Sequence, residues 1–140
     1  MAKEKEFITK RFNIVKASLQ TPTTGLNRKD RAQLRREYRL LGKILDEVVE
    51  GQVLRTLESW RGYLGQELAR HKAAHRAEQE TYDNWWRLPY RQRRTIPKPR
   101  PPAPGVEVTD KQGYVWVVDD RYLAMMDDLT ARLHRWLATG

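Results

Sequence analysis

The sequence contains no cysteine, so disulfide bonds and thiolate metal sites are excluded, and the chain suits a reducing compartment. It also lacks any apolar run approaching the ~20 residues that a membrane-spanning helix needs. Its first ten residues, MAKEKEFITK, are too highly charged for a signal peptide. These absences predict a soluble protein of the cytoplasm, or of a virion interior if the chain is of phage origin.

Signatures of catalysis and cofactor binding are missing as well. There is no glycine-rich phosphate loop, no nucleophile elbow and no cysteine nucleophile. Glu67, His71 and His75 recur every four residues on one predicted helix face, but no other cluster offers a ligand that would complete a metal site. We therefore expect no enzyme activity, no metal, no cofactor and no small-molecule substrate.

Acidic residues are outnumbered, with 18 Asp and Glu against 27 Lys and Arg, for a net charge of +9. The excess is uneven along the chain: residues 81–105 hold six basic residues and one acid, whereas residues 106–140 hold four and six. Positive charge of this kind attracts phosphate backbones, anionic membranes or acidic protein surfaces. The densest positive charge makes residues 81–105 a candidate binding segment.

Apolar periodicity predicts a short first helix. Ile8, Phe12 and Val15 follow the four-three spacing of one helix face, which predicts a helix at residues 3–20. The sequence TPTTG, residues 21–25, ends it because proline and glycine interrupt the pattern.

Two longer helices are expected next. Asn27 is a suitable N-cap for a helix at residues 28–50, and no proline interrupts the chain before a third helix at residues 52–82. The apolar stripe changes face across the sequence VVEGQV, so we expect Gly51 to separate the two.

Proline dominates the following segment. Six prolines between Pro89 and Pro104 disfavour helix across residues 88–105 and favour an extended segment. Beyond it, VEVT and YVWVV flank DKQG, which predicts a β-hairpin, and Asp119 or Asp120 begins a final helix.

The predicted fold class is therefore mainly α, with a helical hairpin or bent helical bundle, a proline-rich segment, and then a small C-terminal β-hairpin plus helix. We expect a helical N-terminal domain at residues 1–87, a basic proline-rich linker at residues 88–105, and the hairpin and helix at residues 106–140.

One candidate binding surface lies on the second predicted helix, where four arginines are spaced by three, four and four residues and share one face. We call them the arginine row: Arg28, Arg31, Arg35 and Arg39. Guanidinium groups hold phosphate in a bidentate way, so the row is a candidate phosphate contact. The alternative is a solvent-exposed face with ion pairs to Asp46, Glu47 and Glu50.

The second candidate surface lies within NWWRLPYRQRRTIPKPRPPAP, residues 84–104, where three aromatic residues are interleaved with basic ones and Tyr82 precedes them. We call nine of these residues the aromatic–basic cluster: Trp85, Trp86, Arg87, Tyr90, Arg91, Arg93, Arg94, Lys98 and Arg100. Aromatic faces stack on unpaired bases while arginines neutralise phosphates. In the alternative interpretation, Trp85 and Trp86 close the helical core and the arginines keep its edge soluble.

The same segment has a third interpretation. Lys98, Pro101 and Pro104 form a K-x-x-P-x-x-P pattern, which an SH3-like groove could bind through polyproline geometry.

We expect a non-catalytic, basic, nucleic-acid-binding accessory protein that is a subunit of a nucleoprotein assembly with other protein subunits and has no membrane partner. DNA and RNA are both open as its ligand. The alternative is a protein–protein adaptor or structural subunit, for example of a virion or a polymerase regulator, without direct nucleic-acid contact.

Overall fold

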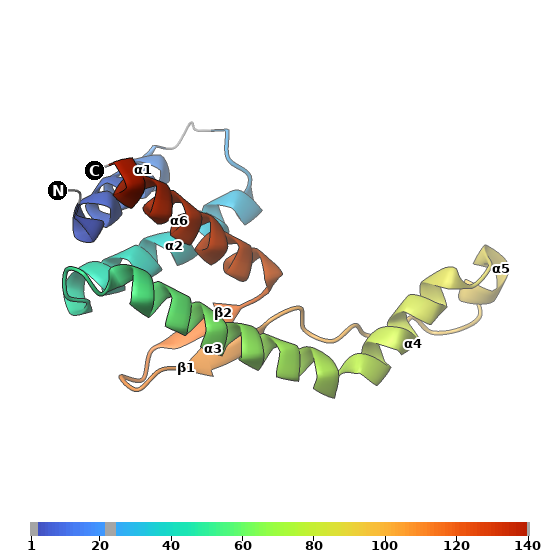
Figure 1. Ribbon diagram of the computed structural model, residues 1–140. Coiled ribbons are helices and arrows are strands. Elements are labelled where there is room, and N and C mark those ends of the chain that lie inside the picture. The colour runs from blue at the N-terminus through green and yellow to red at the C-terminus, as the bar shows by residue number, and fades with distance from the viewer. Residues whose placement is uncertain (1–2, 22–24, 140) are drawn as a thin grey trace. The chain divides into compact units, whose positions relative to one another are not determined.

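The computed structural model describes residues 3–21 and 25–139, and within them the chain forms six helices and one two-stranded hairpin (Figure 1). The expected mainly helical fold, with a small hairpin followed by a C-terminal helix, is confirmed. Residues 22–24 of the expected loop lie outside the described residues. The elements are α1 (Glu4–Gln20), α2 (Arg28–Glu47), α3 (Val53–Ala74), α4 (Arg76–Arg87), α5 (Tyr90–Arg93), β1 (Val106–Thr109), β2 (Val115–Val118) and α6 (Asp120–Thr139).

The boundary between α2 and α3 follows from its backbone chemistry. The Asn27 side chain accepts a hydrogen bond from the Asp30 backbone N–H at 2.8 Å, which satisfies one of the unpaired donors at the start of α2. At the other end, Gly51 has φ +89°, a conformation that favours glycine. The helix expected at residues 28–50 therefore ends at Glu47, because residues 48–52 form the turn that contains Gly51.

The single helix expected at residues 52–82 is wrong in its length and continuity. The structure contains two helices, α3 and α4, separated at His75, whose φ of −110° and ψ of 17° depart from helical values. No residue from 69 to 87 is buried, so no core packing holds this part of the chain as one straight helix. α4 then continues to Arg87 and ends because Leu88 precedes Pro89 and is extended.

The chain divides into two compact units, which we describe separately. Unit 1 comprises the described residues as far as Tyr63 together with Arg121 onward, and unit 2 comprises Leu64–Asp120. These units do not test the expected domain boundaries at residues 87 and 105, which stay a prediction.

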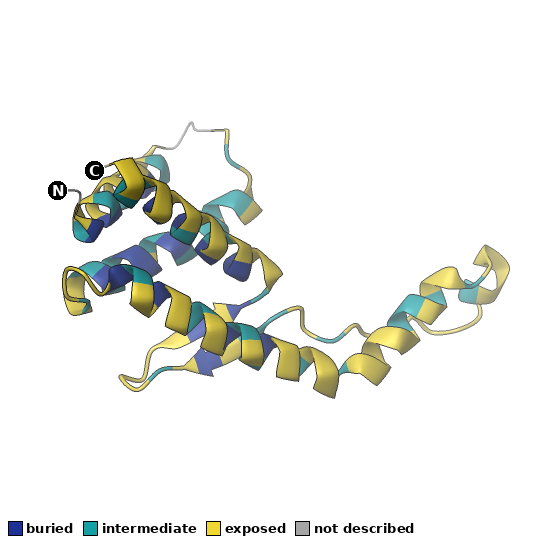
Figure 2. Ribbon diagram, in the orientation of Figure 1, coloured by how far each residue is buried: buried dark blue, intermediate teal, exposed yellow. Residues whose placement is uncertain are grey.

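Unit 1 has a helical core. Figure 2 shows buried residues on α1, α2, the first part of α3 and α6. The apolar stripe of α6 contributes four of them: Tyr122, Met126, Leu129 and Leu133. The remaining core residues come from the other helices of the unit: Ile8, Val15, Leu40, Leu41, Ile44, Val53 and Leu57, with Leu123 from α6.

Polar contacts at two places join the helices of unit 1. The buried Glu4 carboxylate accepts hydrogen bonds from the N–H groups of Val53 and Leu54 at the start of α3, at 3.2 and 2.7 Å. The Glu50 carboxylate in turn accepts from the N–H groups of Glu4 and Lys5 at the start of α1, at 2.6 and 2.9 Å. Glu4, at the start of α1, therefore caps α3, and Glu50, just before α3, caps α1. Negative charge at the start of a helix also interacts favourably with the helix dipole.

The second contact is an ion pair between α1 and α2. The Arg11 guanidinium donates to both Glu37 oxygens, at 2.6 and 2.9 Å, and Glu37 is almost fully buried. The hydrogen bonds from Arg11 to Glu37 raise the pKa of the arginine above its ordinary value. A buried carboxylate needs such a partner, because desolvation otherwise disfavours its charge.

Unit 2 is built on the antiparallel hairpin, in which Val106 pairs with Val118 and Val108 with Trp116. Its buried residues are Leu64 and Leu68 from α3 and Val108, Trp116 and Val118 from the hairpin. The Asp110 side chain organises the turn by accepting hydrogen bonds from two backbone N–H groups and from the Trp116 indole.

Candidate nucleic-acid interface

The arginine row lies on α2 in unit 1, and the structure gives its members different environments. Arg28, Arg35 and Arg39 are exposed, whereas Arg31 is partly buried and donates to the Leu19 carbonyl at 2.8 Å. Arg31 therefore connects α2 to α1, and the other three present their side chains to solvent.

Two of the acids that the alternative interpretation pairs with the row have other contacts. Glu47 pairs with Lys43 at 3.4 Å, and Glu50 caps α1. Within the described ranges, neither Arg28 nor Arg35 makes an ion pair. The outer part of the row keeps its positive charge.

Arg36, which neighbours the arginine row on α2 but does not belong to it, packs against a buried ring. The Arg36 guanidinium lies 5.4 Å from the centroid of the buried Tyr122 ring. Burial raises the pKa of the Tyr122 phenol well above its ordinary value, and the charges of Arg36 and Arg39 oppose that shift. The α2 arginines thus serve two purposes, since Arg36 faces the core while Arg28 and Arg35 face solvent.

The aromatic–basic cluster lies in unit 2, on α4, α5 and the segment that follows them. α4 and α5 contain no buried residue, and Figure 2 shows them in the colours of exposed and half-buried positions. The alternative interpretation, in which Trp85 and Trp86 close a helical core, therefore does not describe their packing: Trp85 is half-buried and Trp86 is 47% exposed. The rings pack against one another instead.

The ring contacts are specific. The Trp85 and Trp86 rings meet edge to face with centroids 5.0 Å apart, and the Tyr82 ring lies edge-on to Trp86 at 6.3 Å. Tyr82 was outside the predicted set, although its spacing of four residues from Trp86 places both on one helix face. Edge-to-face packing of this kind stabilises an aromatic group without a surrounding core.

Arg93 is the central cation of the cluster. Its guanidinium carbon lies 5.8 Å from the Trp85 ring, 5.4 Å from the Trp86 ring and 5.9 Å from the Tyr90 ring. Its side chain is half-buried among them. Arg93 therefore holds rings from α4 and α5 together by cation–π contacts, which are worth ~0.5–1 kcal/mol each at exposed sites.

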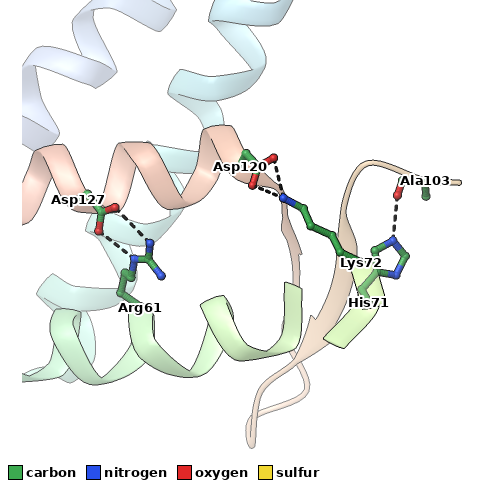
Figure 3. Close-up of polar contacts among 6 residues, drawn as sticks. All are labelled: Arg61, His71, Lys72, Ala103, Asp120 and Asp127. Atoms are coloured by element: carbon green, nitrogen blue, oxygen red, sulfur yellow. Dashed lines mark hydrogen bonds and ion pairs between the residues drawn. The ribbon is translucent and has the colours of Figure 1, made fainter. Parts of the chain in front are cut away.

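The proline-rich segment runs back along α4 and the end of α3. The Trp85 indole N–H donates to the Ile96 carbonyl at 3.0 Å, and the Lys98 ammonium lies 5.0 Å from the Trp86 ring and 5.9 Å from the Tyr82 ring. Further on, the His71 imidazole hydrogen-bonds to the Ala103 carbonyl at 2.9 Å (Figure 3). The order of these contacts shows that the segment is antiparallel to the helices it follows.

Two of the outer cations of the cluster lie beside exposed rings: the Arg94 guanidinium carbon is 6.0 Å from the Tyr90 centroid, and the Lys98 ammonium is 5.0 Å from the Trp86 centroid. Arg91, Arg94, Lys98 and Arg100 are all exposed, and Tyr90 is 68% exposed. Across residues 84–106 the sequence contains no acid. In the part of the chain that the structure describes, none of these four cations makes an ion pair, so their charge is not cancelled locally.

Arg87 differs from the other basic residues of the cluster. Its guanidinium donates to the Asn84 side-chain oxygen at 3.0 Å, one turn earlier on α4. The residue is exposed and the partner is neutral, so its charge also remains available to solvent.

The histidines considered as metal ligands have other partners in the structure. His75 contacts the Glu78 carboxylate at 3.2 Å, and Glu67 accepts from Arg70 at 3.0 Å. Over residues 3–21 and 25–139, no group of three or more histidine, cysteine, aspartate or glutamate side chains is arranged to hold a metal ion. Over the same ranges, no helix has the length and apolar character needed to cross a membrane.

The structure therefore contains two basic surfaces, one in each unit. In each surface, some arginines pack against neighbouring groups and others are exposed to solvent. No protein-family model, curated protein or solved structure matches the chain.

Proposed function

We propose that the chain is a non-catalytic nucleic-acid-binding accessory protein and a subunit of a nucleoprotein assembly. The observation that carries the proposal is the way in which the aromatic–basic cluster holds its cations. Arg93 and Lys98 contact aromatic rings, and no acid lies within residues 84–106. Because a ring attracts a cation without neutralising it, the surface keeps a concentrated positive charge.

The composition of this surface suits a phosphate backbone. Residues 81–105 contribute six basic residues against one acid. Arginine side chains bind phosphate oxygens through paired N–H groups, and each phosphate neutralised releases condensed counterions. The exposed arginines of the row, Arg28 and Arg35, are proposed as a second, weaker phosphate contact.

Salt dependence tests the proposal. The affinity of the purified chain for labelled nucleic acid is measured by fluorescence anisotropy from ~0.05 to ~0.2 M salt, with single-stranded and duplex ligands in separate titrations. We expect the affinity for at least one ligand to fall about a hundredfold over this range, as for a protein that contacts several phosphates. Affinity that does not change with salt would contradict phosphate binding.

Charge reversal then tests the location. Changing Arg91, Arg94 and Arg100 together to Glu should lower affinity by about a hundredfold at moderate salt, because each change replaces a phosphate contact with a repulsion. The matched control makes the same change in net charge at three exposed basic residues outside both surfaces: Lys16, Lys111 and Arg135. An equal loss of affinity in the two variants would show that only overall charge matters and would reject the cluster as the binding site.

A second candidate function is favoured by the hairpin. Tyr114, Val115 and Val117 are large apolar residues that are each more than 40% exposed, and a two-stranded hairpin has little stability of its own. A protein–protein adaptor or structural subunit would cover this surface with another chain. Sedimentation of the wild-type chain beside a Val115→Thr, Val117→Thr variant tests it: self-association that the variant abolishes favours this candidate, and a monomer at all concentrations excludes self-association through the hairpin.

A further inference from the structure

We propose that the aromatic–basic cluster recognises unpaired nucleotides, with Tyr90 and Trp86 stacking on bases while Arg91, Arg94 and Arg100 contact phosphates. This inference rests on the proposed function and adds the class of ligand. It follows from the exposure of the rings, from the support behind them, and from the arrangement of the cations around them.

The exposure of the rings is the first observation. Tyr90 is 68% exposed and Trp86 is 47% exposed, although aromatic side chains are normally buried to a much greater extent. Neither belongs to an apolar core, since α4 and α5 contain no buried residue. Rings held on a basic surface in this way present area on which a planar base can stack.

The second observation is that the rings are supported from inside the cluster. Arg93 lies within 6 Å of both the Trp86 and the Tyr90 centroids, and the edge of Trp85 packs on Trp86. Trp85 is itself fixed by its hydrogen bond to the Ile96 carbonyl. Because these contacts already order the rings, less conformational entropy is lost when a base binds to them.

We therefore assign different roles to residues that the sequence treats alike. Arg93 and Trp85 are positioning residues, because their guanidinium and indole groups hold other parts of the cluster. Arg91, Arg94 and Arg100 are exposed, so their guanidinium groups are open to a phosphate backbone, and that of Arg94 lies 6.0 Å from the Tyr90 centroid.

A duplex would contact the arginines of this surface but not its aromatic rings. Its phosphates can meet arginines, but its base faces are already stacked within the helix and are not available to an exposed ring. An unpaired strand offers both groups, and stacking of a base on an aromatic side chain contributes ~1–3 kcal/mol. The combination of exposed rings and unneutralised cations therefore favours single-stranded segments, loops or ends of DNA or RNA.

The test compares ligands that share one sequence. Single-stranded DNA and single-stranded RNA of about 16 nucleotides, and the corresponding DNA duplex, are titrated with the full chain at about 0.1 M salt. We expect the better of the two single strands to bind at least about tenfold more tightly than the duplex. The DNA and RNA titrations identify which backbone is preferred, and the inference holds with either.

Variants of the rings complete the test. Tyr90→Ala and Trp86→Ala should each weaken single-strand binding by about tenfold and change duplex binding by less than about twofold, whereas Tyr90→Phe should retain single-strand affinity because it keeps the ring. Far-UV circular dichroism confirms that each variant is folded. Tryptophan fluorescence of the wild-type chain provides a measurement that needs no variant, because a base stacked on Trp86 should quench it and a duplex should not.

The outcomes separate this inference from the function on which it rests. Binding to no nucleic acid at low salt would reject the proposed function itself. Equal binding of single strand and duplex, or equal losses for both ligands in the ring variants, would leave nucleic-acid binding intact and overturn the recognition of unpaired nucleotides.

Discussion

The helices of unit 1 and the aromatic–basic cluster of unit 2 hold their arginines in opposite ways. In unit 1, the arginines that join one helix to another include two that pair with carboxylates, Arg11 with Glu37 at 2.6 Å and Arg61 with Asp127 at 2.9 Å (Figure 3). In the cluster, Arg93 packs on aromatic rings instead. Both arrangements order a long side chain, but only the first cancels its charge.

This difference separates arginines that stabilise the fold from those available to a ligand. A carboxylate partner lowers the local potential, whereas a ring partner leaves it positive. Net charge alone does not distinguish the two, because both units are rich in arginine. The partners of the arginines do. Three experiments test the contacts that order unit 1 and a fourth tests the cluster, from the largest expected effect to the smallest.

The largest effect is expected when the buried Arg11–Glu37 ion pair is broken. Arg11→Met leaves the Glu37 carboxylate buried without its partner and should lower the free energy of unfolding by ~3 kcal/mol, measured by urea denaturation. The control is Arg132→Met, which removes an exposed pair with Asp128 and should cost less than ~1 kcal/mol. Equal costs for the two variants would show that burial of the Arg11–Glu37 pair does not matter.

The second experiment examines the caps between α1 and α3. Glu4→Gln removes a charged acceptor from the N–H groups of Val53 and Leu54, and should lower the free energy of unfolding by ~1–2 kcal/mol. The exposed Glu6, two residues away, provides the control, because among the described residues its carboxylate pairs only with Lys10, at 3.8 Å. Glu6→Gln should change stability by no more than ~0.5 kcal/mol. A neutral effect of Glu4→Gln would mean that the capping contacts are not stabilising.

The third experiment measures the ionisation of the buried Tyr122 phenol, whose ring lies near the Arg36 guanidinium. Burial raises the pKa of Tyr122 in the folded chain, so the folded state retains the phenol proton at pH values where the unfolded state loses it. The stability from this group is complete below about pH 10 and is lost as the pH rises above that value, by up to ~1.4 kcal/mol per pH unit.

Urea denaturation at a series of alkaline pH values measures this loss, and Tyr122→Phe should reduce it because the variant has no phenol to ionise. Absorbance at alkaline pH gives a second measurement, since one of the six tyrosines should ionise only when the chain unfolds. Full ionisation of all tyrosines in the folded chain would contradict the burial of this phenol.

The fourth experiment separates a positioning arginine from a contacting one within the cluster. Arg91→Gln should reduce the slope of log affinity against log salt by about 0.7, as expected when one phosphate contact on a single strand is lost. Arg93→Gln should leave that slope nearly unchanged, while it alters tryptophan fluorescence and weakens binding a few-fold by releasing the rings. If the two variants have the same salt slope, their roles are not distinct.

Much of the fold could be predicted because its signals are local. The spacing of Ile8 and Val15, the Asn27 cap and the left-handed Gly51 each depend on neighbouring residues, and the structure contains the corresponding helix face, cap and turn. The apolar stripe of α6 was predictable for the same reason.

Contacts between residues distant in the sequence were not predictable. Glu37 is the clearest example, because a glutamate on a helix is normally exposed and only the approach of Arg11 from α1 explains its burial. The mutual capping of α1 and α3 likewise joins residues that are far apart in the sequence. The break at His75 was missed because no proline or glycine marks it.

The residues of the candidate site were predictable as a group, but their individual roles were not. The sequence shows that aromatic and basic residues alternate near Pro89, and this pattern alone defines the cluster. Which cation lies among the rings depends on how the chain turns back after that proline. Arg93 and Arg91 are two residues apart, yet one is half-buried among aromatic rings and the other is exposed.

The most direct test of the central claim is photo-crosslinking of the wild-type chain to a bound single strand, followed by mass spectrometry of the crosslinked peptides. If nucleic acid binds through the aromatic–basic cluster, adducts should concentrate on the peptides that contain Trp86 and Tyr90. Adducts confined to the arginine row or to the hairpin, in a chain that binds the strand, would contradict the account.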